Sequence, residues 1–327
     1  MSLMNSHCKK EMTAPENRNS NTTYVGLDIS KCRLDSVVAD GKSREDANSA
    51  EGRAAFVKHV ARLAKPRVIC EATGGYEKAI VAALMEAGVE VCVVQPGRGR
   101  HYALAEGLLA KDDRIDARLL VRFGEKIQPR CEIRPDPSAQ RLREMLEYRR
   151  ILTDTIVETR NRLELATGYL RDGLQTQIHT LEASIKQADS DIEIHISSHS
   201  DLSSRAKRLR QLCGAGPVLA ATLMAYLPEL GQIDGKVIAA LVGVAPHPNE
   251  SGGHSKKRKV TGGRDSVRHV LYMAAVSAIR YNPILSAFYK RLRDQKGKPH
   301  KVALVAVMRK MINVLNRLAA DPEFSLA

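Results

Sequence analysis

Residues 24–94 alternate between short β-like segments and helical stretches, and this alternation limits the possible folds more than any other feature of the sequence. Two successive strand patterns come first, and strand and helix patterns then follow in turn. This order predicts a mixed sheet with helices packed on it, so the first part of the chain is expected to be α/β. The expected elements are strands at 24–30, 32–40 and 44–48, a helix at 50–63, a strand at 67–75, a helix at 76–87, a strand at 89–96, and helices at 98–110 and 113–127.

The remainder of the chain is dominated by helical patterns. Apolar residues from Leu142 to Ile192 recur mostly at steps of three, four or seven, which predicts a long helical hairpin or coiled coil with Gly168 and Gly173 at its turn. Such an arm would serve as a spacer or as a dimerisation element. After it, helices with one irregular interruption at 245–263 predict an all-α region. The expected division is a disordered tail at 1–22, an α/β domain at 23–135, a coiled coil or helical hairpin at 136–200 and an all-α domain at 201–327.

Positive charge is concentrated in the last third of the chain. The 327 residues include 51 Lys and Arg against 37 Asp and Glu, a formal net charge of +14. Residues 201–327 alone hold 21 Lys and Arg against 8 acids, whereas the first two hundred are nearly balanced, with 30 and 29. This distribution predicts a polyanionic partner for the C-terminal region.

The other compositional features favour a cytoplasmic protein with no membrane partner. Six cysteines show no zinc-ligand spacing and no disulfide pattern, and reduced, mostly buried thiols fit them best. No apolar run is long enough to span a bilayer, and the polar start lacks the apolar segment of a signal peptide.

Four acidic residues are candidates for a metal site. Asp28 lies inside the first expected strand, where Asp is depleted, and a charge there requires a partner or a metal. Glu71 ends the segment RVICE, while Asp113 and Asp116 share one face at a helix start. Together they would offer the all-oxygen ligands that suit Mg²⁺. The alternative is that they are ordinary surface acids, since Asp is favoured in the first turn of any helix.

The segment APHPNESGGHSKKRKVTGG contains a candidate nucleophile. Ser251 precedes two glycines that would let the backbone approach a phosphate, and a run of basic residues that would neutralise it follows. A serine hydroxyl needs a metal, a base or a favourable electrostatic setting to attack a phosphodiester. The alternative is a flexible loop whose serine is merely small and polar. The candidate phosphate contacts here are Gly252, Gly253, Lys256, Lys257, Arg258 and Lys259.

Other segments of the last third also suggest contacts with nucleic acid. CGAGPVLAATLMAYLPELG is typical of a helix-hairpin-helix, although a tight turn between packed helices explains the same glycines. KRLRDQKGKPHK is a charge run whose position in the basic third favours phosphate contacts. The candidate residues are Gly214, Gly216, Arg264, Arg268, Lys290, Arg291 and Arg293. The remaining acids of the second strand and the turn after it, Asp35 and Asp40, are expected to face solvent or to occupy turns.

From about residue 23 to 320 the chain resembles the DEDD transposases of the insertion-sequence 110 (IS110) family, the relatives of the Piv and MooV DNA invertases. The resemblance rests on six fragments in the family's order: YVGLDISK, ICEATGGY, KDDRIDAR, LCGAGPVLAATLMAYLPEL, GVAPHPNESGG and VRHVLYMAA. It implies an N-terminal RuvC-like domain of ribonuclease H fold and a C-terminal transposase domain.

The resemblance also implies roles for individual residues. Asp28, Glu71, Asp113 and Asp116 would be the DEDD tetrad that holds Mg²⁺, and Ser251 would form a covalent phosphoserine link to DNA. Because these groups belong to different domains, the active centre would be assembled between domains or across protomers. The implied partners are donor and target DNA, a bridge RNA that guides the enzyme by base pairing, and further copies of the chain in a dimer or tetramer.

Two positions depart from the family pattern. Asp112 stands where relatives commonly have Thr, and it is an alternative third ligand to Asp113 at a spacing of i to i+4 from Asp116. His247 replaces a common Arg, which affects one expected phosphate contact. Two other functions stay open: a hydrolytic nuclease or junction resolvase in which Ser251 is incidental, and a nucleic-acid-binding protein without catalysis.

Overall fold

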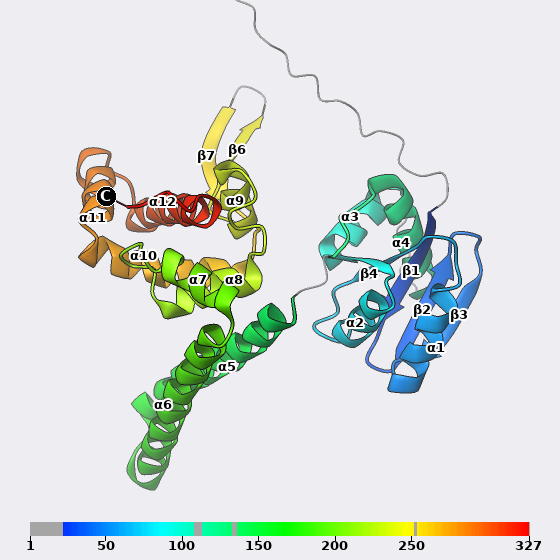
Figure 1. Cartoon of the computed structure of the whole chain (residues 1–327), viewed down its shortest axis with the longest axis horizontal. Coiled ribbons are helices and arrows are strands. Elements are labelled where there is room, and N and C mark those ends of the chain that lie inside the picture. Colours follow the sequence, from blue (N-terminus) through cyan, green and yellow to red (C-terminus); the bar gives the residue numbers. More distant parts are fainter. Residues whose placement is uncertain (1–21, 108–112, 133–135, 252–253, 327) are drawn as a thin grey trace, which may run out of the picture. The chain divides into compact units, whose positions relative to one another are not determined.

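The chain forms two compact units, 1–134 and 135–327, in a computed structural model (Figure 1). The structure describes residues 22–107, 113–132, 136–251 and 254–326, with the backbone alone at 113–116 and 247–259. The tail expected at 1–22 therefore lies almost wholly outside the described residues, as do Asp112, Gly252 and Gly253. None of the helices within the described ranges is long and apolar enough to cross a membrane.

The first unit contains a five-stranded sheet with the strand order β3-β2-β1-β4-β5. Strand β1 pairs antiparallel with β2 and parallel with β4, and β4 pairs parallel with β5. The mixed sheet predicted from the sequence is thus confirmed. The strands are β1 (Thr23–Ile29), β2 (Arg33–Val38), β3 (Ser43–Ala47), β4 (Pro66–Glu71) and β5 (Glu90–Val94).

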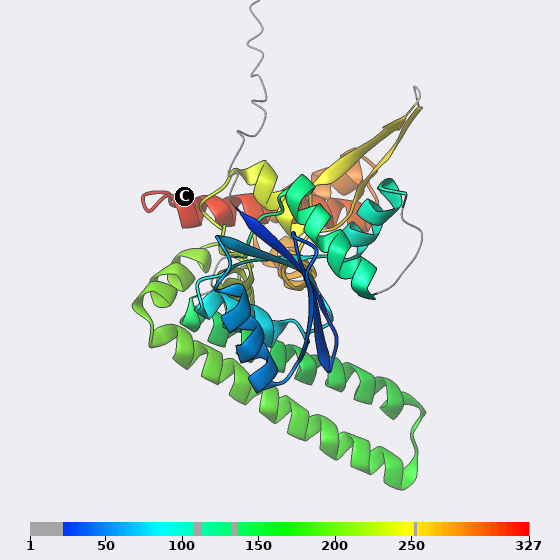
Figure 2. The same cartoon turned by 90° about the vertical axis from the view of Figure 1, so that its right-hand side faces the viewer.

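Helices cover both faces of this sheet, as Figure 2 shows. Successive side chains of a strand point to opposite faces, so each strand contributes to two cores. Leu27 of β1 packs with Phe56 and Ile80 from helices α1 (Ala50–Val60) and α2 (Lys78–Glu86). On the other face, Tyr24 packs with Leu120 of helix α4 (Asp113–Ile127), and helix α3 (Pro96–Ala105) lies against α4.

Helix α4 approaches the sheet so closely that it requires glycine on both surfaces. A Cβ atom on Gly26 of β1 would lie 1.9 Å from the carbonyl oxygen of Ala117, and one on Gly124 would lie 2.7 Å from side-chain atoms of Tyr24 and Ile69. Since Gly26 follows Tyr24 in β1 while Ala117 precedes Gly124 in α4, the helix runs antiparallel to β1. Its N-terminus therefore lies at the end of the sheet where β1 finishes.

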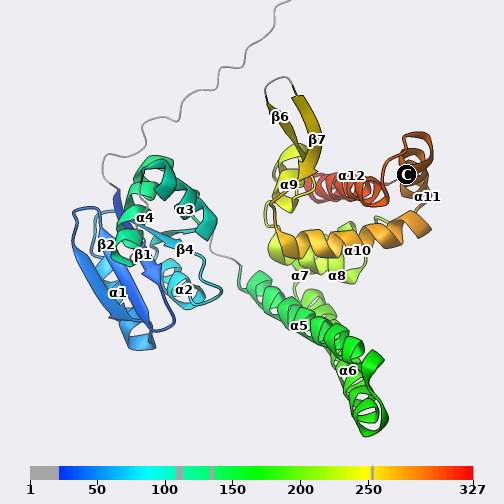
Figure 3. The same cartoon turned by 180° about the vertical axis from the view of Figure 1, so that it is seen from behind.

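The second unit is mostly helical and has one large apolar core, to which Leu142, Ile196, Leu223, Leu271 and Leu315 belong. Figure 3 shows these helices from behind. Their bounds are α5 (Pro137–Leu165), α6 (Gly168–Ser197), α7 (Ser200–Leu209), α8 (Pro217–Tyr226), α9 (Gly235–Val242), α10 (Asp265–Tyr281), α11 (Pro283–Lys290), a π-helical turn (Arg291–Gln295) and α12 (His300–Ala320).

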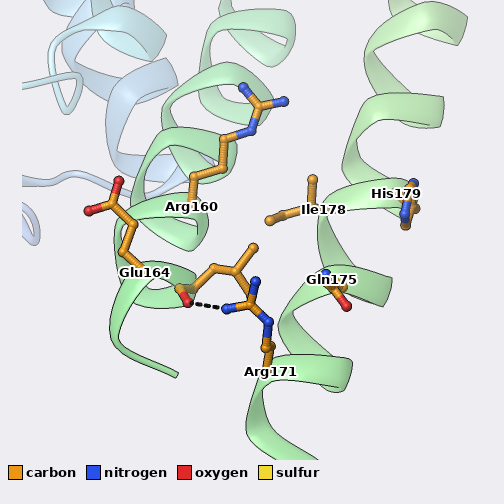
Figure 4. Close-up of a pocket in the computed structure, with 7 residues that line it drawn as sticks. Arg160, Glu164, Arg171, Gln175, Ile178 and His179 are labelled. Carbon is orange, nitrogen blue, oxygen red and sulfur yellow. Dashed lines mark hydrogen bonds between the residues drawn. The ribbon is translucent and has the colours of Figure 1, made fainter. Parts of the chain in front are cut away.

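Helices α5 and α6 form the expected long hairpin, and the base of the hairpin joins the core of the second unit. Gly168 begins α6 with a positive φ of 52° directly after the connection. Gly173, also expected at the turn, lies inside α6, so that part of the prediction is wrong. Near the tip, Arg171 donates a hydrogen bond to the carbonyl of Leu163 beside a hollow of about 360 Å³ (Figure 4). The finer description as a coiled coil stays a prediction.

The irregular interruption expected at 245–263 is instead a β-hairpin, so the all-α prediction for the last third is wrong. Strands β6 (Pro246–Ser251) and β7 (His254–Val260) pair antiparallel and project from the helices (Figure 1). Two strands separated by Gly-Gly are a hairpin signal in sequence, and proline is tolerated in a strand that lies at an edge. Both strands of a two-stranded sheet are edges, which explains why the prolines did not prevent pairing.

Candidate active site and nucleic-acid interface

Asp28 and Glu71 lie on the same face and at the same edge of the first sheet. Leu27 pairs with Cys70 across the parallel strands β1 and β4, so the next residues, Asp28 and Glu71, stand at the same level. Asp28 is the penultimate residue of β1, and Glu71 is the last residue of β4. Both lie on the face of the sheet that packs against α4. Ile69, two residues before Glu71 and therefore on the same face, belongs to the core between the sheet and α4.

The beginning of α4 reaches this same edge. Asp113 is the first residue of α4 and lies four residues, or about 6 Å of helix rise, before Ala117. Asp28 lies two residues, or roughly 6.6 Å of strand, beyond Gly26, the residue that Ala117 contacts. The backbone at Asp113 is thereby level with Asp28, while that of Asp116, one residue or about 1.5 Å of rise before Ala117, lies closer to the level of Gly26. The side chains of Asp113 and Asp116 lie outside the described residues.

The helix N-terminus also favours negative charge at this edge. Unpaired backbone N–H groups give it a partial positive charge, which stabilises nearby carboxylates. Within the described residues, no three His, Cys, Asp or Glu side chains are grouped as in a metal site. The structure thus brings the Asp28 and Glu71 side chains to one edge, and it adds the backbone at the start of α4 there.

Glu71 is confined by helix α3. Its Oε1 atom would lie 2.0 Å from a Cβ atom placed on Gly99, the fourth residue of α3. Only a residue without a side chain leaves this space to the carboxylate. Gly97, two residues earlier in the same helix, has no atom within 4 Å of the corresponding position. Gly99 therefore shapes the site, and nothing in the isolated sequence distinguished it from Gly97.

The loop after Glu71 is organised by Glu77. Its Oε2 atom accepts hydrogen bonds from the backbone N–H of Gly75 at 2.8 Å and from the N–H and hydroxyl of Thr73 at 3.0 Å each. Burial raises the pKa of Glu77, but the hydrogen bonds from its own backbone, Gly75 and Thr73 outweigh burial and hold the pKa below its ordinary value. Glu77 is thus held as a carboxylate that fixes the chain two residues after Glu71.

Asn48 ties a second loop to the same region. Its Nδ2 atom donates to the carbonyl of Ser30 at 2.9 Å and lies 3.5 Å from the carbonyl of Tyr76. Arg53 Nη1 in turn donates to the Asn48 carbonyl at 2.8 Å and to its Oδ1 at 3.0 Å. The turn after β1 and the loop after β4 are therefore linked beside the carboxylates.

Asp35 does not behave as the solvent-facing or turn residue expected from sequence. It lies within β2 directly opposite Asp28, and its side chain is only 18% exposed. Asp40 does occupy the turn after β2, where it forms an ion pair with Lys42 at 2.9 Å. The signal for this pairing is present in the sequence, because the short connection between β1 and β2 implies a hairpin in which residues 28 and 35 are opposite each other.

Ser251 lies at the far end of the β6–β7 hairpin, where it pairs with His254. The base of the hairpin is held by a close glycine contact, since a Cβ atom on Gly243 would lie 2.1 Å from the carbonyl oxygen of Gly262. The run from Lys256 to Lys259 lies along β7 opposite Asn249 to His247, so it extends from near Ser251 toward the base of the hairpin. Their side chains lie outside the described residues.

The expected helix-hairpin-helix glycines lie between α7 and α8. Gly214 has a φ of 103°, and a Cβ atom there would lie 2.5 Å from that of Ala278, so packing explains this glycine. Gly216 is the N-cap of α8 and faces open space. Both line a hollow of about 800 Å³ that also borders Arg149 and Arg150 of α5.

The remaining candidate basic residues differ in how they are engaged. Arg264 forms a bidentate ion pair with Glu229 at 2.6 and 2.7 Å, which fastens the start of α10 to the segment after α8. Arg268 bonds the Gly262 carbonyl and the Asp265 carboxylate. The other candidates, Lys290 at the end of α11 and Arg291 and Arg293 in the π-helical turn, are exposed.

Comparison with known proteins places this geometry in a family. Residues 25–166 match the DEDD profile of the IS110 family, described as "Transposase", and residues 206–290 match the profile described as "Transposase IS116/IS110/IS902 family". Two curated relatives are the pilin gene-inverting proteins of Moraxella lacunata and Moraxella bovis. Each is 27% identical to this chain over 304 residues, which covers 89% of this chain and 94% of the relative.

The two profile matches and the curated relatives identify the chain as a DNA recombinase of the transposase class. The mixed sheet of the first unit is consistent with this class. The chain belongs to the IS110 family of DEDD transposases. The DEDD match also assigns a RuvC-like fold to the first unit. DNA is therefore the substrate class of this enzyme.

The Gly99→Ala variant is expected to lose DNA cleavage while remaining folded. The added methyl group must displace the Glu71 carboxylate, which is the acid expected from the sequence to hold the metal. Gly97→Ala is the matched control, because it adds the same group to the same helix in open space. Cleavage assays and thermal melts of both variants check this, and equal activity of the two would contradict it.

The contribution of Glu77 to stability should disappear at low pH. Because its folded-state pKa is lowered, its carboxylate stabilises the fold above the unfolded value near 4.5, and this stabilisation is lost as pH falls through the folded pKa. Urea unfolding of wild type and Glu77→Gln at pH 7 and pH 3.5 measures it. The gap in unfolding free energy should narrow at the lower pH, and a constant gap would refute the assignment.

Proposed function

We propose that this enzyme is an RNA-guided recombinase of an insertion sequence, which cleaves and rejoins DNA through Ser251 with Mg²⁺ held at the carboxylate edge of the first unit. The observation that carries the proposal is the convergence of Asp28, Glu71 and the start of α4 on one edge of the sheet. The family membership supplies the DNA substrate on which such a site acts.

The residues at this edge fit Mg²⁺ chemically. Carboxylate oxygens are its preferred protein ligands, and it keeps waters that substrate phosphates replace. Asp28 and Glu71 would hold the ion together with Asp113 and Asp116, for which Asp112 is the alternative third acid. When bound, the ion would stabilise negative charge on phosphate oxygens.

Ser251 would act as the nucleophile. Its Oγ atom forms a bond to phosphorus, the bond from phosphorus to the deoxyribose oxygen breaks, and the proton lost by Ser251 is balanced by one taken up on the leaving hydroxyl. Attack by another strand's hydroxyl reverses these changes and frees Ser251, so the energy of the phosphodiester is retained for rejoining. The backbone of Ser251 ends β6 at the far end of the hairpin, and this position supports the role.

The basic third of the chain would bind donor DNA, target DNA and a bridge RNA. The 21 Lys and Arg of residues 201–327 supply the counter-charge for their phosphates. We assign direct contacts to the hairpin residues Lys256 to Lys259, to Gly216 at the N-terminus of α8, and to the exposed residues from Lys290 to Arg293. Base pairing with the RNA would select the sequences, while the protein reads shape and backbone.

A homo-oligomer, as a dimer or tetramer, would complete the active centre. Ser251 and the carboxylates belong to different units, and they would meet at one phosphate either within a chain or between chains. Near the tip of the α5–α6 hairpin, Leu165 and Tyr169 are 90% and 96% exposed. Large apolar side chains this exposed favour contact with another copy. Such an enzyme would act at the nucleoid, in the bacterial cytoplasm.

Substitution of the nucleophile separates the recombinase from a hydrolytic nuclease. Ser251→Ala should reduce cleavage on the order of 10³-fold or more and abolish a denaturation-resistant DNA adduct. Ser255→Ala, across the same hairpin, is the control and should retain both. Gel assays under denaturing conditions report the two products. Cleavage that survives in Ser251→Ala would establish the nuclease reading instead.

The proposal of a guide RNA is tested by identifying the nucleic acid that copurifies with the protein. Purified enzyme should carry a structured RNA, and ribonuclease treatment should abolish recombination until that RNA is restored. Sequencing of the copurified RNA and a recombination assay with and without ribonuclease check both expectations. Recombination at full rate after complete RNA removal would overturn the guide assignment.

A further inference from the structure

We infer that Asp35 is a further carboxylate of the metal site, positioned across the strand pair from Asp28. This inference rests on the proposed Mg²⁺ site and adds a residue to it that lies outside the DEDD tetrad. The pairing of β1 with β2 places Asp35 directly opposite Asp28. Directly opposite residues share a face and have Cβ atoms about 4.5–5.5 Å apart.

Asp35 belongs to a row of acids that crosses four neighbouring strands. It pairs with Glu45 of β3 on one side and with Asp28 of β1 on the other, and Glu71 of β4 continues the row. Like charges in directly opposite positions destabilise a sheet. A row of this kind is therefore an arrangement that a cation on the same face would stabilise.

Arg33 compensates the outer part of this row. Its guanidinium lies 3.8 Å from Glu45 Oε1 and 3.9 Å from Asp35 Oδ2. The two acids differ in solvent exposure. The Glu45 side chain, on the edge strand β3, is 60% exposed, whereas that of Asp35 is only 18% exposed. Glu45 is thus solvated beside Arg33, whereas Asp35 is confined between Arg33 and Asp28.

This location gives Asp35 a defined part in the site. Because the described side chains of Asp28, Asp35 and Glu71 do not form a three-ligand group, the Asp35 carboxylate would act through one of the ion's waters, and it would orient Asp28 from the adjacent strand. Outer carboxylates of this kind typically alter metal affinity by about 10- to 100-fold when removed. Asp35 acts from β2, which no member of the tetrad occupies.

The test measures metal binding by the full chain without DNA. Mn²⁺ titration calorimetry of wild type, Asp35→Asn and Glu45→Gln is the central comparison. Both substitutions remove one acid beside Arg33, but only Asp35→Asn removes the acid opposite Asp28. We expect Asp35→Asn to weaken Mn²⁺ binding about 10-fold or more, and Glu45→Gln to match wild type. Asp35→Ser provides a second variant, and thermal melts without metal report folding.

The outcomes distinguish this inference from the proposed function. If Asp28→Asn abolishes Mn²⁺ binding while Asp35→Asn and Asp35→Ser match Glu45→Gln, the role of Asp35 is overturned and the metal site stands. If Asp28→Asn binds Mn²⁺ as wild type does, the metal site of the proposed function is itself wrong. A selective loss in both Asp35 variants, with metal-free melting at or above the wild-type temperature, supports the inference.

Discussion

Carboxylates on neighbouring strands repel one another, and the first unit has to hold them together against that repulsion. It does so with apolar packing beneath them. Leu27 and Ile69, next to Asp28 and near Glu71 in sequence, are both fully buried. Burial of each such side chain contributes about 1.5–3 kcal/mol, whereas an opposed pair of like charges costs on the order of 1 kcal/mol. Apolar packing therefore outweighs the repulsion and fixes the positions of the carboxylates.

The close contact of α4 with the sheet is the most specific part of this packing. Because Gly26 lacks a side chain, the backbone of Ala117 reaches the strand itself, and the start of the helix comes level with Asp28. Gly99 does the same for Glu71 on α3. The close contacts at Gly26 and Gly99 thus bring the N-terminus of α4 and the ends of β1 and β4 together. Glu77 and Asn48 then fix the loops that leave this edge.

The two units divide charge and chemistry between them. The acids proposed to hold the metal lie in the first unit, which has 22 Lys and Arg against 18 Asp and Glu, while Ser251 and most of the basic surplus, 29 Lys and Arg against 19 acids, lie in the second. In the proposed mechanism DNA brings the two units together, because the basic unit would bind its phosphates and the acidic edge would act on them through a cation. Neither part alone holds the complete set of groups proposed for strand exchange.

Much of the fold followed from sequence, because period-2 and helical patterns identified the strands and helices of the first unit correctly. The same patterns failed at 245–263, where proline and glycine suggested irregular structure although a two-residue Gly-Gly connection favours a hairpin. Asp35 was misplaced because its role depends on register, which relates residues on different strands. Gly99 and Glu77 could not be identified, since close approach and hydrogen bonding to a loop leave no periodic signal.

The central claim is that the edge formed by Asp28 and Glu71 holds a divalent cation. Anomalous diffraction from crystals of the full chain grown with Mn²⁺ tests it most directly, because the ion's position is then observed independently of any activity. The account predicts an Mn²⁺ peak within coordination distance of carboxylate oxygens of both Asp28 and Glu71. A peak elsewhere, or carboxylates at this edge bound only by basic side chains in the presence of saturating Mn²⁺, would contradict it.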